Sequence, residues 1–179
     1  MGDAELIARA FNAELGVYHL VRIIGGASEP LYLPVTQHRY SAEIYFREDY
    51  AASALHELAH WCLAGKKRRA LEDYGYWYDS QRDEFQQQKF EAVETKPQAI
   101  EWMLSVAAGI DFRISSDNFD IEKLDVEPFR DCVKESVLAM IKTGLPVIVK
   151  VLGSCLADKM PNGNASFDRE FHYRNLPDK

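Results

Sequence analysis

Cysteine is scarce in this sequence, and its scarcity limits how the chain could be cross-linked or bind a metal. The 179 residues include only 3 cysteines, which are Cys62, Cys132 and Cys155. They are widely spaced, and no Cys-x-x-Cys pair occurs. This argues against both a disulfide framework and a thiolate zinc site. We therefore expect three buried thiols in a reducing compartment.

Long apolar runs and an excess of positive charge are also missing. No stretch approaches the roughly 18 consecutive apolar residues of a membrane-spanning helix, and the segment Met1–Glu5 lacks the basic start of a signal peptide. We therefore expect a soluble, cytoplasmic protein with no membrane partner. The formal net charge of -7 and the pI near 5.3 argue against binding to bulk nucleic acid, because such binding relies on cations that replace phosphate counterions.

The chain does have the size and the apolar content of one folded domain. Its residues are 47% hydrophobic and 27% charged, a balance that allows a core to be buried. No internal repeat, low-complexity tract or linker divides it. We predict a single α+β domain over residues 1–179, in which several helices pack on a small β-sheet. The tail beyond about residue 160 is predicted to be irregular.

Apolar residues at helical spacing predict the helices. One helix is expected to be interrupted by Pro97, to restart at a capping box between Thr95 and Gln98, and to end at Gly109. The other predicted helices, three of which would end at Gly16, Gly65 and Gly144, cover residues 3–15, 50–64, 128–142 and 146–157.

Strands are predicted where β-branched residues gather or where apolar and polar residues alternate. These patterns occur at residues 17–24 and 40–46. Residues 30–34 begin and end with proline and are predicted to form a loop or an edge strand. Residues 66–88 are polar and irregular, which predicts a long loop of the kind that often has a function.

Two of the five histidines stand at the spacing of a metal-binding helix. His56 and His60 lie four residues apart, about one helical turn, so both imidazoles should project from the same face. Glu57 lies beside them and could accept a proton from a metal-bound water or orient a ligand. The alternative interpretation is that both histidines merely flank a core helix. Because histidine is rare in this chain, the spacing favours a metal site.

A third protein ligand must come from elsewhere in the chain. The metzincin pattern would need a histidine six residues after His60, where Lys66 stands instead, so a carboxylate is favoured. We favour Glu94, because a ligand on a second packed helix is held more rigidly than one on a loop. The carboxylates that stay open as alternatives are, in order of preference, Asp73 and Glu91, and also Glu72.

Two imidazoles and one carboxylate leave positions open on the metal for other ligands. This arrangement suits ferrous iron that must bind both oxygen and substrate, and the same trio also binds catalytic zinc. A zinc metallopeptidase that uses Glu57 as its base is therefore the main rival to an iron oxygenase. A metal-stabilised adaptor would need a closed site with four ligands, and no fourth His or Cys at a suitable spacing supports one.

Several segments together resemble the bacterial elongation factor P hydroxylase family. They lie within about residues 29 to 120, and their order and spacing are more specific than the metal motif alone. The region after Gly144 resembles the family only loosely. The matching segments are His56–Gly65, the pair Arg68–Arg69, Asp73–Tyr78 and Val93–Ala99, together with Glu29–Pro34 and Val106–Gly109.

The resemblance implies a function, a fold and a ligand set. It implies an iron-dependent hydroxylase that adds a hydroxyl group to the lysine of elongation factor P that already carries a β-lysyl group, with molecular oxygen as co-substrate. It also implies a fold similar to that of a bacterial metal-dependent ribonuclease. Carried onto this sequence, the Fe(II) ligands become His56, His60 and Glu94, with Glu57 close beside them. Whether 2-oxoglutarate takes part is left open.

Two further groups of residues could contact a substrate or a partner protein. A cationic modified lysine would need acidic or aromatic side chains to guide it to the metal, and Asp73, Glu91, Tyr76 and Trp77 are available. The basic run Lys66, Lys67, Arg68 and Arg69 follows the metal-binding helix directly. It fits either a contact with an acidic or tRNA-shaped partner or a solvated helix end, where cations suit the helix dipole.

Overall fold

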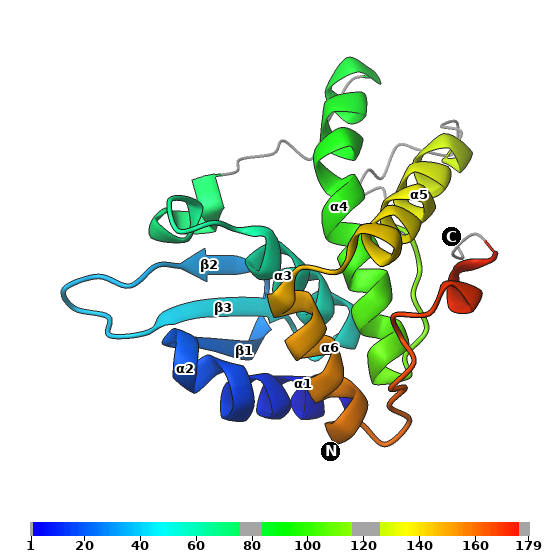
Figure 1. The fold of residues 1–179 in the computed structure, drawn as a ribbon. Helices are drawn as coiled ribbons and strands as arrows, with labels where there is room; N and C mark the ends of the chain where they lie inside the picture. The colour runs from blue at the N-terminus through cyan, green and yellow to red at the C-terminus, as the bar shows by residue number, and fades with distance from the viewer. Residues whose placement is uncertain (1, 76–83, 116–125, 176–179) are drawn as a thin grey trace.

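A three-stranded sheet with helices packed against it forms the framework of the protein (Figure 1). The structure is a computed structural model, and it describes residues 2–75, 84–115 and 126–175. The strand order is β1-β3-β2, in which β1 pairs with β3 in parallel and β2 pairs with β3 in antiparallel orientation. The predicted α+β class is confirmed. The strands are β1 (Val21–Ala27), β2 (Leu31–Leu33) and β3 (Ala42–Arg47).

Alternation along the central strand places one face of the sheet in the core. Ala42, Ile44 and Phe46 are buried, and Val21 and Ile23 lie beside the first two of them on β1. The predicted strand at residues 40–46 is therefore confirmed, with a shift of about one or two residues at its ends. The segment between the two prolines forms the edge strand β2, which was one of its two predicted forms.

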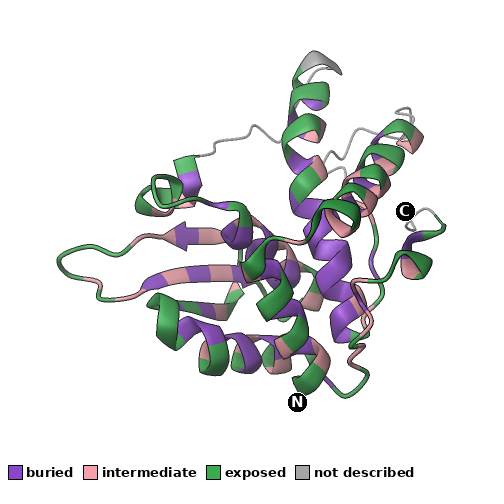
Figure 2. Ribbon diagram, viewed as in Figure 1, coloured by how far each residue is buried: buried purple, intermediate pink, exposed green. Residues whose placement is uncertain are grey.

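The helices cover this sheet and add a second layer. Apolar residues of the sheet, α1, α3, α6 and one side of α4 form the main core, and the other side of α4 packs with α5 in a second cluster. Figure 2 shows that burial along α4 rises toward its C-terminal half. The helices are α1 (Asp3–Phe11), α2 (Val17–His19), α3 (Ala51–Leu63), α4 (Glu84–Ala108), α5 (Glu127–Thr143) and α6 (Val147–Lys159).

The first helical segment is longer than predicted, and the first strand is shorter. A π-helical turn at Asn12–Gly16 continues α1 into α2, so the prediction that Gly16 ends the helix was wrong. The strand begins at Val21 instead of residue 17, after Leu20 ends the helix in a left-handed conformation with φ 51°. Gly16 serves close packing, because a Cβ there would lie 2.5 Å from the carbonyl oxygen of Val21.

Helix α4 is continuous through Pro97, so the predicted interruption was wrong. The Thr95 hydroxyl donates to the carbonyl oxygen of Glu91 at 2.7 Å instead of capping a new helix. The helix packs against α3, α5 and α6, and this packing compensates for the one backbone hydrogen bond that proline removes. Because α4 begins at Glu84, the predicted loop over residues 66–88 was also too long.

Three smaller expectations have mixed outcomes. α3 ends at Leu63, and the next residue, Ala64, is extended, so no left-handed cap forms at Gly65. Cys62 is buried and Cys155 is half-buried, but Cys132 is exposed, so the prediction of three buried thiols was wrong for that residue. The tail after Met160 is mostly irregular, as predicted, although Glu170–Tyr173 forms a short 3₁₀ helix.

Helix length and apolar content together bear on whether a helix can cross a membrane. Within the described residues, no single helix is long and apolar enough to do so, whereas α5 and α6, joined at a bend of 99°, reach the required length and composition only as a pair.

Candidate metal centre

The two motif histidines lie on the face of α3 that points to α4. The remaining faces of α3 bury Leu55, Leu58 and Ala59 in the main core, which leaves the histidine face for polar contacts. The Nε2 atoms of His56 and His60 are 3.1 Å apart, and the two rings meet edge to face. One helical turn therefore places both imidazole nitrogens at one point, as the spacing predicts.

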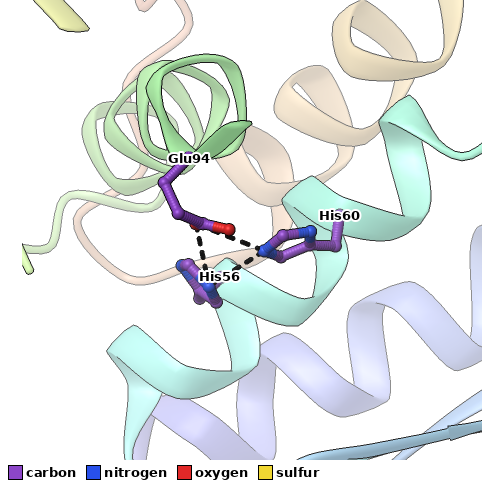
Figure 3. A group of neighbouring side chains, drawn as sticks. All are labelled: His56, His60 and Glu94. Atoms are coloured by element: carbon purple, nitrogen blue, oxygen red, sulfur yellow. Dashed lines mark hydrogen bonds and ion pairs between the residues drawn. The ribbon is translucent and has the colours of Figure 1, made fainter. Parts of the chain in front are cut away.

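Glu94 reaches this point from α4 (Figure 3). One of its carboxylate oxygens lies 3.7 Å from Nε2 of His56 and 3.5 Å from Nε2 of His60. The Glu94 side chain is almost fully buried, whereas the two imidazoles are partly exposed. Among the described residues, these three form the one group of ligating side chains close enough to share an ion.

The other candidate carboxylates stand apart from this group. Asp73 lines the same cavity, but one of its oxygens accepts a hydrogen bond from the backbone N–H of Tyr32 at 2.7 Å. Glu91 accepts a hydrogen bond from Gln87 one turn away on α4 and does not line the cavity. Glu72 is exposed on a short 3₁₀ helix. The structure thus places the favoured carboxylate, and not its rivals, beside both histidines.

The spacing of the three donor atoms fits a single ion. Atoms separated by 3.1, 3.5 and 3.7 Å lie on a circle with a radius of about 2.0 Å, which is the length of a typical bond from a metal to imidazole nitrogen or carboxylate oxygen. Two neutral nitrogens and one carboxylate oxygen are also a donor set that divalent iron and zinc both accept. The residues present therefore fit a transition-metal ion.

Sequence reasoning missed Glu101, a second carboxylate that contacts the site from α4. Its Oε2 lies 2.8 Å from Nδ1 of His56, and its side chain is buried. Glu101 follows Glu94 by seven residues, or about two turns, which places both on the same face of α4. The seven-residue spacing could have identified Glu101 from the sequence, but only if α4 had been predicted as one continuous helix through Pro97.

The surrounding carboxylates determine the protonation of His56. Burial lowers the pKa of its imidazole, but the negative charge and hydrogen bond of Glu101, together with the charges of Glu94 and Glu57, outweigh that effect and raise the pKa to about 10. Without an ion, His56 therefore carries a proton at neutral pH. A metal cation would replace that proton, because it offers positive charge to the same carboxylates.

Comparison with known proteins identifies the family. The family model described as elongation factor P hydroxylase matches residues 10–168. The chain belongs to this family. A relative from Haemophilus influenzae named elongation factor P lysine hydroxylase is 42% identical over 153 residues, which are 85% of this chain and 86% of the relative. The resemblance seen in the sequence is confirmed, and the match also extends beyond Gly144 through most of the C-terminal part.

In this member of the elongation factor P hydroxylase family, a cavity of about 450 Å³ adjoins the three candidate ligands. Glu57 lines it, and burial raises the pKa of its carboxyl group, with His56 and His60 opposing the shift and Glu94 and Asp73 adding to it. Arg47 and Arg113 lie among the other lining residues. The cavity offers a polar chamber beside the ligands in which a side chain of moderate length could lie.

The wall of the cavity next to His60 is formed by an unusual turn. Asp73, Tyr74 and Gly75 have φ values of 46°, 55° and 75°, so three successive residues are left-handed. The Tyr74 ring stacks on Tyr32 with centroids 4.1 Å apart, and this contact and the Asp73 hydrogen bond hold the turn in place. Non-glycine residues in this conformation are strained, and such strain is often found at functional sites.

Only some of the residues expected to contact a substrate or a partner protein lie at the cavity. Of the residues proposed to guide a cationic lysine, Asp73 lines the cavity and Glu91 does not, while Tyr76 and Trp77 lie outside the described residues. In the basic run, Arg69 donates to the carbonyl oxygen of Trp61 at 2.8 Å and covers its ring at 4.2 Å. Arg69 therefore stabilises the end of α3, whereas Lys66 and Lys67 are exposed.

Proposed function

We propose that this chain hydroxylates a lysine side chain of elongation factor P, with ferrous iron held by His56, His60 and Glu94. The observation that carries the proposal is a set of two imidazoles and one carboxylate beside a cavity, in a chain that belongs to the elongation factor P hydroxylase family. Bound iron would supply the activation of molecular oxygen that insertion into a C–H bond requires. Because the substrate is a translation factor, we place this activity in the cytoplasm.

The residues around the cavity have distinct tasks in this proposal. Because α3 and α4 supply the three ligands and the cavity adjoins them, an ion held there would be open to oxygen and substrate from the cavity. Glu57 stands beside the ligands on the cavity wall, where its carboxyl group can hold or pass a proton. Burial raises the pKa of this carboxyl group, which favours its protonated form.

The strained turn supplies the contact for the charged end of the substrate. A lysine side chain, with or without a β-lysyl group, ends in an ammonium group, which needs a carboxylate or an aromatic face nearby. Asp73 and Tyr74 present both on the same wall of the cavity. We infer that they orient the substrate so that its carbon chain lies beside the iron.

The proposal is tested by the mass of the substrate. Iron-loaded protein, prepared without air, is incubated with β-lysylated elongation factor P, and air is then admitted in the presence or absence of 2-oxoglutarate. We expect the intact mass of the substrate to increase by one oxygen atom. The His56→Ala variant should give no increase, and Glu91→Gln, a change outside the cavity, should match the parent. An unchanged substrate mass with iron bound would contradict the proposal.

A zinc-dependent hydrolase is the second candidate, and the position of Glu57 favours it. A glutamate between two histidine ligands, on the wall of an open cavity, is placed as the base of a metallopeptidase would be. The test is to load the protein with Zn²⁺ and to look for cleavage of elongation factor P or of unfolded peptides. Fragments that disappear in Glu57→Gln would support hydrolysis, and intact substrates would exclude it for these proteins.

A further inference from the structure

Three buried polar side chains form a stripe on the face of α4 that meets α3. Glu94, Gln98 and Glu101 are 2%, 1% and 6% exposed, and their spacing of four and three residues places them on one side of the helix. Buried polar groups of this kind are rarely without a defined partner. Each of the three therefore needs its own explanation.

Each residue of this stripe has a different partner. Glu94 faces both imidazoles. The Gln98 amide donates to the carbonyl oxygen of Ser115 at 2.6 Å and accepts from its N–H at 3.1 Å, which ties the chain after α4 back onto the helix. Glu101 contacts His56 at 2.8 Å, and this contact goes to Nδ1, the ring nitrogen that faces away from the other candidate ligands.

That single contact decides which nitrogen of His56 faces the ion. A carboxylate accepts hydrogen bonds, so Nδ1 carries a proton, and when a metal cation displaces the second proton of the imidazolium, the lone pair that binds the cation is on Nε2. The same Nε2 lies 3.1 Å from Nε2 of His60 and 3.7 Å from Glu94. Without Glu101, the ring could take the other tautomer or turn about its bond to Cβ, and either change would remove one ligand atom.

We propose that Glu101 is the positioning residue of the metal centre, holding His56 as its Nδ1–H tautomer with Nε2 directed at the ion. This inference rests on the proposed ligand set but not on the reaction that the ion supports. It separates the two glutamates near His56. Both glutamates line the cavity, but Glu101 contacts Nδ1 of His56 at 2.8 Å from α4, whereas Glu57 interacts with the two imidazoles through its charge.

The alternative is that Glu101 only contributes to packing between α3 and α4. Two variants distinguish the roles. Glu101→Gln keeps the shape and can still accept from Nδ1–H, but it loses the charge. Glu101→Ala removes the acceptor altogether. Glu91→Gln serves as a matched control on the same helix, and Glu94→Gln shows the effect of removing a ligand.

The experiment titrates each purified metal-free variant with Zn²⁺ and follows the ring-nitrogen chemical shifts of His56 by NMR. We expect Glu101→Gln to bind Zn²⁺ about tenfold more weakly than the parent and Glu101→Ala about 100-fold more weakly, still with one ion per chain. The Nδ1–H signal of His56 should shift in the first variant and be lost or displaced in the second. Circular dichroism establishes that each variant is folded.

Two outcomes would overturn the inference. Unchanged Zn²⁺ affinity and unchanged His56 shifts in both Glu101 variants would leave only a packing role. A loss of Zn²⁺ affinity in Glu101→Gln as large as that in Glu94→Gln would make Glu101 a ligand instead of a positioning residue. Neither readout needs elongation factor P or oxygen, so failure of the proposed hydroxylation would be detected separately.

Discussion

The two nitrogens of His56 have different partners, and this difference organises the centre at the scale of single residues. Nδ1 meets Glu101 on α4, and Nε2 meets His60 and Glu94. Two carboxylates of α4, Glu101 and Glu94, therefore contact opposite nitrogens of the same imidazole. Asp73 makes no such contact, and a hydrogen bond from the backbone N–H of Tyr32 holds it on the cavity wall. The residues that bind an ion and those that meet a substrate should respond differently to substitution.

Replacing the carboxylate ligand should remove the ion without removing the fold. Glu94→Gln keeps the size of a buried side chain but exchanges an anionic oxygen for a neutral amide, so we expect Zn²⁺ or Fe²⁺ affinity to fall by at least about 100-fold. The matched change Glu91→Gln should leave affinity within about twofold, because Glu91 lies outside the cavity. Metal titration followed by elemental analysis measures both. Equal affinity in the two variants would show that Glu94 is not a ligand.

Asp73 should affect substrate binding more than catalysis. Asn tolerates the left-handed conformation and retains the oxygen that accepts from Tyr32, so Asp73→Asn should change stability by less than about 1 kcal/mol. Loss of the negative charge should raise KM for lysylated elongation factor P roughly tenfold, with kcat little changed. The exposed neighbour Glu72 provides the control Glu72→Gln. An unaltered KM for Asp73→Asn would show that Asp73 takes no part in substrate recognition.

At the scale of elements, α4 is the part on which the site and both cores depend. Its polar stripe faces α3, and its apolar residues divide between the main core and the cluster with α5. The helix ends at Gly109, which has φ 69°, and the tail packs directly against this end through a hydrogen bond from Asn164 to Ala107. The end of α4 is thus fixed by a distant segment as well as by local sequence.

Two glycines with positive φ make this dependence testable. A Cβ at Gly109 would lie 2.0 Å from the carbonyl oxygen of Asn162, whereas the space around Gly144 at the end of α5 is open. Gly109→Ala combines a backbone clash with strain and should lower the free energy of unfolding by about 3–5 kcal/mol, against about 1–3 kcal/mol from strain alone in Gly144→Ala. Urea denaturation of both variants measures the difference. A larger effect at Gly144 would contradict this account.

At the scale of the whole molecule, the irregular C-terminal tail packs into the second hydrophobic cluster, which α4 and α5 form. Tyr173 is fully buried against Trp102, with ring centroids 5.0 Å apart, and its hydroxyl donates to the carbonyl oxygen of Phe167. Phe167 in turn packs against Gly153 of α6, where a Cβ would meet its ring at 2.4 Å. The tail is therefore part of the core although it has little regular secondary structure.

Removing the tail anchor should destabilise the whole fold. Tyr173→Ala deletes a buried ring and should lower the free energy of unfolding by about 3–5 kcal/mol. Tyr173→Phe keeps the ring and should lower it by about 1–3 kcal/mol, because the Phe167 carbonyl loses its donor. Thermal unfolding measured by circular dichroism would show the order of the two effects. Equal midpoints for parent and Tyr173→Ala would mean that the tail contributes nothing to stability.

The amino-acid sequence by itself determined the local features, because neighbours one turn apart on a helix or two residues apart on a strand meet whatever the rest of the chain does. The apposition of His56 and His60 and the alternation along β3 are of this kind, and so are the buried apolar residues of α4, which are Ala99, Ile100, Met103, Leu104 and Ala107. The preference for a carboxylate on a second helix also led to Glu94, which the structure places beside both histidines.

Tertiary structure alone decided the features that depend on distant partners. Glu101 meets His56 across 45 residues of sequence, Asp73 is held by Tyr32 across 41, and packing against three helices keeps α4 continuous through Pro97. Local sequence at Pro97 favours a break, and local sequence at Asp73 and Tyr74 disfavours a left-handed turn. Both preferences are overridden because the packing and hydrogen bonds of the folded protein outweigh a local penalty of a few kcal/mol at most.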